Sequence, residues 1–158
     1  MVMKMFCCLC LWFLNFHVGC DMSVDGYFQN IIYESYKINI YKEGVVNEIY
    51  KNDPLFNILN YEFCNMLIDS REMPALGIAL NDEIVNELNM GLWIEFVFHD
   101  VHVHEGLEFS SLLIKVEPDG FGFNIFRKVN GEYMGRCFYI QLNEKNMGNF
   151  SKILVENL

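Results

Sequence analysis

Basic residues are scarce in this chain of 158 residues. It contains 11 Lys and Arg against 21 Asp and Glu, which gives a net charge of −10. A nucleic-acid-binding surface needs clustered Lys and Arg to meet the phosphates, so this composition argues against nucleic acid as a partner. A basic protein surface or a cationic ligand is easier to accommodate, although the same acidity also keeps a small domain soluble and monomeric.

The motifs of several enzyme classes are also missing. The sequence has no Gly-rich phosphate loop and no Gly-x-Ser-x-Gly nucleophile elbow. After residue 20 it has no Cys-x-x-Cys pair or Cys/His spacing that indicates zinc. No alternating strand–helix–strand run favours a doubly wound nucleotide-binding sheet. These absences favour a non-enzymatic domain.

Residues 1–21 have the layout of an export signal. A single cation, Lys4, precedes an uninterrupted apolar run at residues 5–14. A short positive start and an apolar core of about 7–15 residues are typical of a secretory signal peptide. The run is too short for a transmembrane helix, which needs about 20 residues.

The end of this leader leaves two alternatives open. The sequence before Cys20 resembles a bacterial lipoprotein box, which predicts lipid on Cys20 and an exported or membrane-anchored protein. His17 stands where such boxes usually have leucine. The alternative is a true start at Met22 and a cytoplasmic protein. On either interpretation residues 22–158 are long enough to form one domain.

Two cysteines follow the leader. Cys64 falls in a predicted helix and Cys137 in a predicted strand. Free cysteine is among the most buried residue types, so two buried thiols are the default expectation. The sequence leaves open whether the two form a disulfide.

Three helices are predicted, at residues 54–69, 82–90 and 149–157. Asp53 is suited to cap the first helix, and Pro54 is favourable at a first helical position. Asn81 is the expected cap of the second helix, and Gly91 its stop.

The apolar period changes from 3.6 to 2 at about residue 92, which predicts four antiparallel strands within residues 92–142. Their expected ranges are 92–98, 109–117, 121–129 and 132–142. Asn130-Gly131 is a strong signal for a tight hairpin between the last two. Pairing Val129 with Glu132 then places Phe123 opposite Phe138 and Ile125 opposite Arg136.

The region before these elements is less regular. Residues 37–40 alternate in polarity, which suits a half-buried strand. Residues 45–50 are either a second strand or a short helix. The whole domain is therefore expected to be α+β, an antiparallel β-meander with helices covering one face.

One cluster of residues suits a metal ion. Three of the four histidines fall within residues 99–104, and Glu108 follows. On an extended segment His102 and His104 point the same way, and with Glu108 they form a ligand set for Zn²⁺, Mn²⁺ or Fe²⁺. The alternative is a solvated connection between two strands.

The string from His102 to Glu108 resembles the first metal motif of cupins in its ligand spacing. This resemblance covers seven residues and implies a bound divalent transition metal. No histidine follows His104, so the second cupin motif has no metal ligand here, and the flanking glycines are misplaced.

Arg127 and Arg136 are the other candidate binding residues. On the expected hairpin they share a face, where two guanidinium groups suit a carboxylate, a phosphate or a partner. The alternative is that both side chains pack along the sheet and reach Glu132 or water.

We therefore expect a binding or interaction domain without a cofactor, whose acidic surface or aromatic sheet meets another protein or a small ligand. The alternative is a metal-binding protein or metal-dependent enzyme that uses His102, His104 and Glu108.

Overall fold

The computed structural model describes residues 25–74 and 77–158. The predicted leader, the lipidation candidate Cys20 and the alternative start at Met22 lie outside these residues. No helix within the described ranges has both the length and the apolar character needed to span a bilayer.

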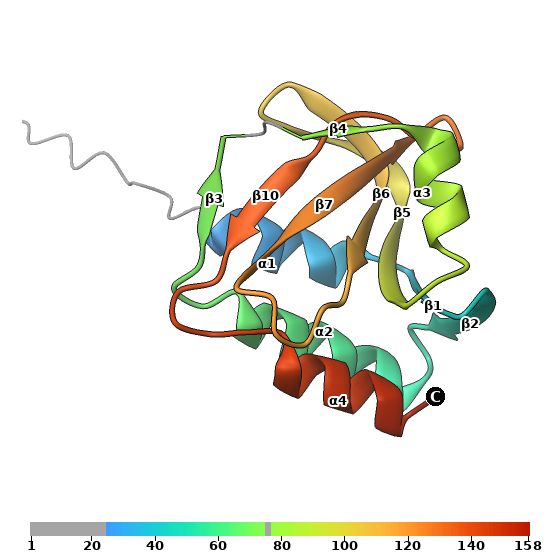
Figure 1. Cartoon of the computed structure of the whole chain (residues 1–158), viewed down its shortest axis with the longest axis vertical. Coiled ribbons are helices and arrows are strands. Elements are labelled where there is room, and N and C mark those ends of the chain that lie inside the picture. The colour runs from blue at the N-terminus through green and yellow to red at the C-terminus, as the bar shows by residue number, and fades with distance from the viewer. Residues whose placement is uncertain (1–24, 75–76) are drawn as a thin grey trace, which may run out of the picture.

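The described residues form four helices and ten strands, most of which are labelled in Figure 1. In chain order they are α1 (Asp25–Glu34), β1 (Lys37–Lys42), β2 (Val45–Tyr50), α2 (Pro54–Met66), β3 (Arg71–Met73), β4 (Ile78–Ala79), α3 (Asn81–Glu87), β5 (Leu92–His104), β6 (Leu107–Lys115), β7 (Gly122–Val129), β8 (Glu132–Tyr133), β9 (Gly135–Arg136), β10 (Phe138–Gln141) and α4 (Gly148–Glu156). The α+β class with an antiparallel sheet is therefore confirmed.

The main sheet has the strand order β2-β1-β5-β6-β7-β10-β3, and β8 pairs with β7. The predicted meander of residues 92–142 forms its centre. Strands β1 and β2 extend one edge, so residues 45–50 are a strand and the helix alternative is wrong. Strand β3, which the sequence did not predict, forms the other edge. A separate small sheet joins β4 to β9.

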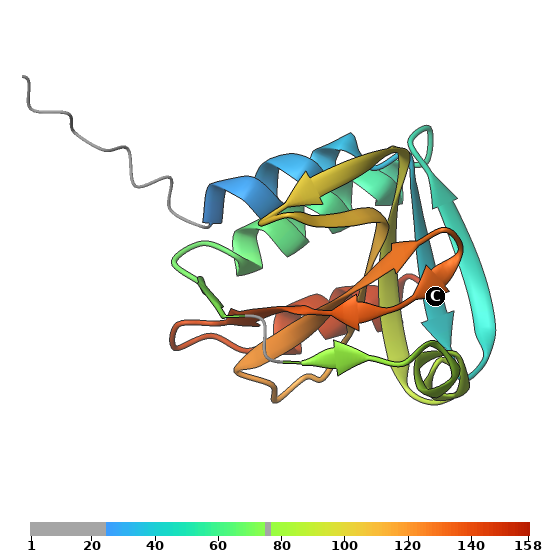
Figure 2. The same ribbon diagram turned by 90° about the horizontal axis from the view of Figure 1, so that it is seen from above.

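The helices divide between the two faces of the sheet. Residues of α1, α2 and α4 share one apolar core with residues of the central strands. Helix α3 instead packs through Ile84 in a second cluster that contains Trp93 and Leu113 on the opposite face. Figure 2 shows α3 on the side of the sheet away from α1. The expectation that all helices cover one face is therefore wrong for α3.

Helix α2 begins as the sequence predicts. The Asp53 side chain accepts a hydrogen bond from the Leu55 amide at 2.8 Å, and Pro54 occupies the first turn. The fully buried Phe63 then contacts Phe96 of β5, with ring centroids 4.9 Å apart. It also lies 5.5 Å from the ring of Phe150 in α4, so one ring joins two helices and the sheet.

The N-terminus of α3 differs from the prediction. Asn81 is the first helical residue, and Leu80 occupies the cap position without a side-chain hydrogen bond. The Asn81 side chain instead accepts a hydrogen bond from the Tyr133 amide at 3.0 Å. This contact fastens α3 to β8 across the second face of the sheet.

The β7 hairpin has the predicted turn but a shifted register beyond it. After β8 the returning strand stops pairing with β7, and the chain bends at Gly135, whose φ of +75° suits glycine. Ile125 then pairs with Phe138, and Phe123 with Ile140, so the predicted partners of both residues are wrong by two positions. A shift of two preserves the side-chain period, which is why all four residues still share the buried face.

A buried carboxylate lies at the centre of the second face. Glu95 of β5 is 1% exposed and accepts four side-chain hydrogen bonds, two of them from Tyr41 at 2.7 Å and Tyr133 at 2.9 Å. The other two come from Asn39 at 2.8 Å and Ser111 at 2.5 Å. We call these five residues the Glu95 cluster.

Lys128 completes the charge balance of the Glu95 cluster. Its Nζ lies 3.6 Å from a Glu95 oxygen and 4.7 Å from the centroid of the Tyr133 ring. Burial alone would raise the pKa of Glu95, but the Lys128 charge and the hydrogen bonds outweigh it and lower this pKa. Hydrogen bonds to a charged group contribute about 1.5–3 kcal/mol each, enough together to offset a desolvation cost of several kcal/mol.

Replacing Glu95→Gln should lower the free energy of unfolding by about 3 kcal/mol at neutral pH, because the amide nitrogen cannot accept the buried hydrogen bonds. The folded-state pKa of Glu95 is lowered, so its contribution is present above the unfolded pKa of about 4.3 and is lost as pH falls through the folded pKa. Urea unfolding of both proteins across this pH range measures the difference, with Glu132→Gln at an exposed position as control. A difference that stays constant with pH would contradict a buried, ionised Glu95.

Replacing Gly122→Ala should destabilise the protein by about 1–3 kcal/mol, because the sheet is already closely packed there. A Cβ on Gly122 would lie 2.5 Å from the Tyr139 hydroxyl and 2.7 Å from the Ile140 carbonyl oxygen. Gly26→Ala in α1 is the matched control, since its Cβ would meet nothing within 4 Å. Thermal unfolding compares the two variants, and equal midpoints would exclude this steric account.

Candidate functional site

The histidine cluster lies on a long hairpin. Strand β5 continues to His104, β6 begins at Leu107, and Glu105-Gly106 forms a two-residue turn with φ of 50° and 74°. Residues 99–108 are therefore strand ends and a tight turn rather than an irregular loop, and most of them are exposed to solvent, as the alternative interpretation expected.

The hairpin does not gather the three predicted metal ligands. His102 pairs with Phe109 and His104 with Leu107, whereas Glu108 pairs with Val103. Directly paired residues share a face of a sheet, so Glu108 projects from the face opposite to the two histidines. His102 and His104 do share a face, as the sequence predicts.

Aromatic rings pack against the histidines. His99 stacks on Tyr36 and His104 on Tyr27, each with centroids 3.9 Å apart. His102 lies 5.7 Å from the ring of Phe109 and its Nε2 is 4.0 Å from a carboxylate oxygen of Glu34. These contacts attach the end of the hairpin to α1 and to the segment that follows it.

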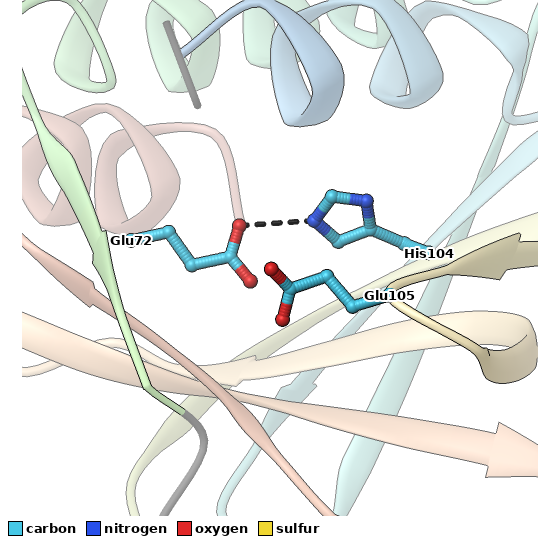
Figure 3. A group of neighbouring side chains, drawn as sticks. All are labelled: Glu72, His104 and Glu105. Carbon is cyan, nitrogen blue, oxygen red and sulfur yellow. Dashed lines mark hydrogen bonds and ion pairs between the residues drawn. The ribbon is translucent and has the colours of Figure 1, made fainter.

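A different set of three side chains comes together around His104. Its Nε2 lies 2.9 Å from a carboxylate oxygen of Glu72 in β3, and Glu105 of the hairpin turn lies beside them. Figure 3 shows the Glu72 carboxylate directed toward the imidazole and the Glu105 carboxylate beside that of Glu72. Ligand atoms of the three residues all lie within 4.8 Å of one another. We call Glu72, His104 and Glu105 the His104 cluster.

Two of these three groups are shielded from water. The side chain of Glu72 is 6% exposed and that of His104 is 17% exposed, while Glu105 is exposed. Burial raises the pKa of Glu72, and the hydrogen bond and charge of His104 offset only part of this rise. The site therefore holds a largely buried carboxylate that is hydrogen-bonded to the His104 imidazole.

The position of β3 explains why the sequence did not indicate Glu72. Glu72 pairs with Ile140 of β10, which turns its side chain toward the core face and the hairpin. It lies 32 residues from His104, in a short polar stretch beyond the predicted helix at residues 54–69. A three-residue edge strand has too short a pattern to be recognised from alternation.

Arg127 and Arg136 take different positions. Arg127 is 7% exposed, and its guanidinium donates hydrogen bonds to the carbonyls of Glu108, Met134 and Arg136. The exposed Arg136 lies in β9 and pairs with Ile78 of the small sheet. The buried guanidinium thus fills the break between β8 and β10, and the two residues do not present a joint fork to solvent.

The two described cysteines are free and buried on opposite faces of the sheet. Cys64 belongs to the core beneath the helices, and Cys137 to the cluster around Trp93. Burial raises the pKa of Cys64 to about 11 and also raises that of Cys137. Both are therefore protonated at neutral pH, and thiols in this form are weak nucleophiles.

An acidic corner lies where the C-terminal part of α2 meets the loop before α4. A hollow of about 420 Å³ is lined by Glu62 and Glu144, by the apolar Met66 and Phe150, and by three asparagines. A second hollow, lined by Asp69, shares Glu144 with the first. We call Glu62, Asp69 and Glu144 the acidic corner.

Lys145 is the basic residue that lines both hollows. Its Nζ donates a hydrogen bond to the Ile68 carbonyl at 2.8 Å, which holds the ammonium group at the edge of α2. The three carboxylates of the acidic corner therefore outnumber the cation beside them.

No protein-family model matches this chain, and neither does any curated protein or solved structure.

Proposed function

We propose that this protein is a non-enzymatic binding domain that holds a Lys- or Arg-rich segment of a partner protein at the acidic corner. The observation that carries this proposal is the pair of adjoining hollows, which combine three carboxylates with the apolar side chains of Met66 and Phe150. Lys and Arg side chains have apolar stems and charged ends, so they are chemically complementary to such a surface.

The distribution of charge supports the same partner. Lys37, Lys115, Lys128 and Lys152 each lie within 4.0 Å of a glutamate, so these cations are already compensated within the domain. Because the net charge of the chain is −10, a large acidic excess faces solvent. An acidic surface attracts basic proteins at long range and repels nucleic acid.

Neutralising the corner should weaken binding to a basic peptide. In the triple variant Glu62→Gln, Asp69→Asn and Glu144→Gln, we expect affinity for a fluorescent octalysine peptide to fall about tenfold or more at low salt. Asp69 has a φ of 65°, which asparagine adopts readily, so the substitution preserves the backbone. Fluorescence anisotropy at increasing salt measures the affinity.

The matched control is Asp100→Asn, Glu108→Gln and Glu132→Gln, which removes the same charge from exposed positions elsewhere. General electrostatic attraction alone would weaken both triple variants equally, and that result would contradict a site at the acidic corner. Circular dichroism confirms that both variants are folded.

A further inference from the structure

The His104 cluster brings together side chains from two parts of the chain that the fold places side by side. Strand β3 supplies Glu72, and the end of the β5–β6 hairpin supplies His104 and Glu105. We propose that these three residues form a binding site for a divalent transition-metal ion, Zn²⁺ in the first instance, with a fourth position open to water.

The distances suit an ion after a small adjustment. Metal–ligand distances of about 2.1 Å in a tetrahedral site place neighbouring ligand atoms about 3.4 Å apart. The Glu72 and His104 atoms are 2.9 Å apart, and the remaining separations do not exceed 4.8 Å. The ion would replace the direct hydrogen bond, and the exposed Glu105 side chain is free to rotate toward it.

The imidazole is already held in the orientation that an ion requires. The ring of His104 stacks on Tyr27 at an interplanar angle of 12°, and its centroid lies 5.2 Å from those of Phe28 and Phe138. Tyr27 is itself held by a hydrogen bond from its hydroxyl to the Val103 carbonyl at 3.3 Å. These contacts fix the ring while its Nε2 points at Glu72, so little conformational entropy would be lost on binding.

The charges and donor atoms select the class of ion. Within residues 25–74 and 77–158, neither Glu72 nor Glu105 forms an ion pair with Lys or Arg. Two carboxylates and a neutral imidazole carry a charge of about −2, which a divalent ion neutralises. The nitrogen ligand favours Zn²⁺ and other transition metals over Mg²⁺ and Ca²⁺, which prefer oxygen.

A bound ion would connect the edge of the sheet to its central hairpin. Strand β3 has three residues and lies at the edge of the described sheet, where it pairs with β10. An ion shared by Glu72, His104 and Glu105 would fasten this strand to β5 and raise the stability of the folded state, since the unfolded chain lacks the site. This site is separate from the acidic corner, so its test does not depend on the proposed function.

Titration of the purified full chain with Zn²⁺, followed by competition with a chromophoric chelator, tests the site. We expect one Zn²⁺ ion to bind per chain and a loss of affinity of about tenfold or more in Glu105→Gln, a change at an exposed position that leaves the fold intact. Glu72→Gln should lose at least as much. Glu108→Gln and His102→Asn are the matched controls and should keep the wild-type affinity.

A spectrum of the Co²⁺-substituted protein provides a second readout. Wild type should show the intense visible absorption of four-coordinate cobalt, and Glu105→Gln should weaken or shift it. Failure to bind Zn²⁺ stoichiometrically would overturn the proposal. Adventitious binding would also overturn it. In that case Glu72→Gln and Glu105→Gln would bind Zn²⁺ with wild-type affinity, or His102→Asn would abolish Zn²⁺ binding instead.

Discussion

The Glu95 carboxylate is the group on which the second face of the sheet, with strand β8 and helix α3, depends. It lies on β5, at the centre of the sheet, and its hydrogen-bond donors come from β1, β6 and β8. A buried charge is tolerated only when its neighbours satisfy it, so the donors must hold their positions whenever Glu95 is ionised. Because Tyr133 is one of these donors and its amide also binds Asn81, the cluster fixes β8 and, through it, helix α3.

The opposite face is built on a different principle. Its core is almost wholly apolar, with aromatic rings such as Phe63 and Phe96 joining three helices to the sheet. Apolar packing is not directional, whereas hydrogen bonds to a carboxylate specify both partner and position. At the end of this face α1 meets the β5–β6 hairpin through stacked rings, and this contact places His104 opposite Glu72.

The sequence predicted the elements that carry long local patterns. Helix α2 has a cap, a favourable proline and an apolar stripe, and the β7 hairpin has Asn130-Gly131. Short elements that depend on tertiary contacts were not predicted, among them β3 and the break at Gly135. Glu95 gave a weak signal, a lone charge inside the apolar run of β5, but its donors lie 16 to 56 residues away. Of the candidate metal ligands only His104 belongs to the cluster that forms, because Glu72 comes from a segment without a recognisable pattern.

A double-mutant cycle between Glu95 and Tyr133 tests the central role of this carboxylate most directly. Tyr133→Phe removes only the hydroxyl that donates a hydrogen bond to Glu95. Glu95→Gln removes the negative charge of the group that accepts this hydrogen bond. The free energies of unfolding of wild type, both single variants and the double variant give their interaction. If the Glu95 cluster holds β8 and α3 on the sheet, the coupling energy between Glu95 and Tyr133 should be about 1–3 kcal/mol. Additive effects of the two substitutions would contradict this account.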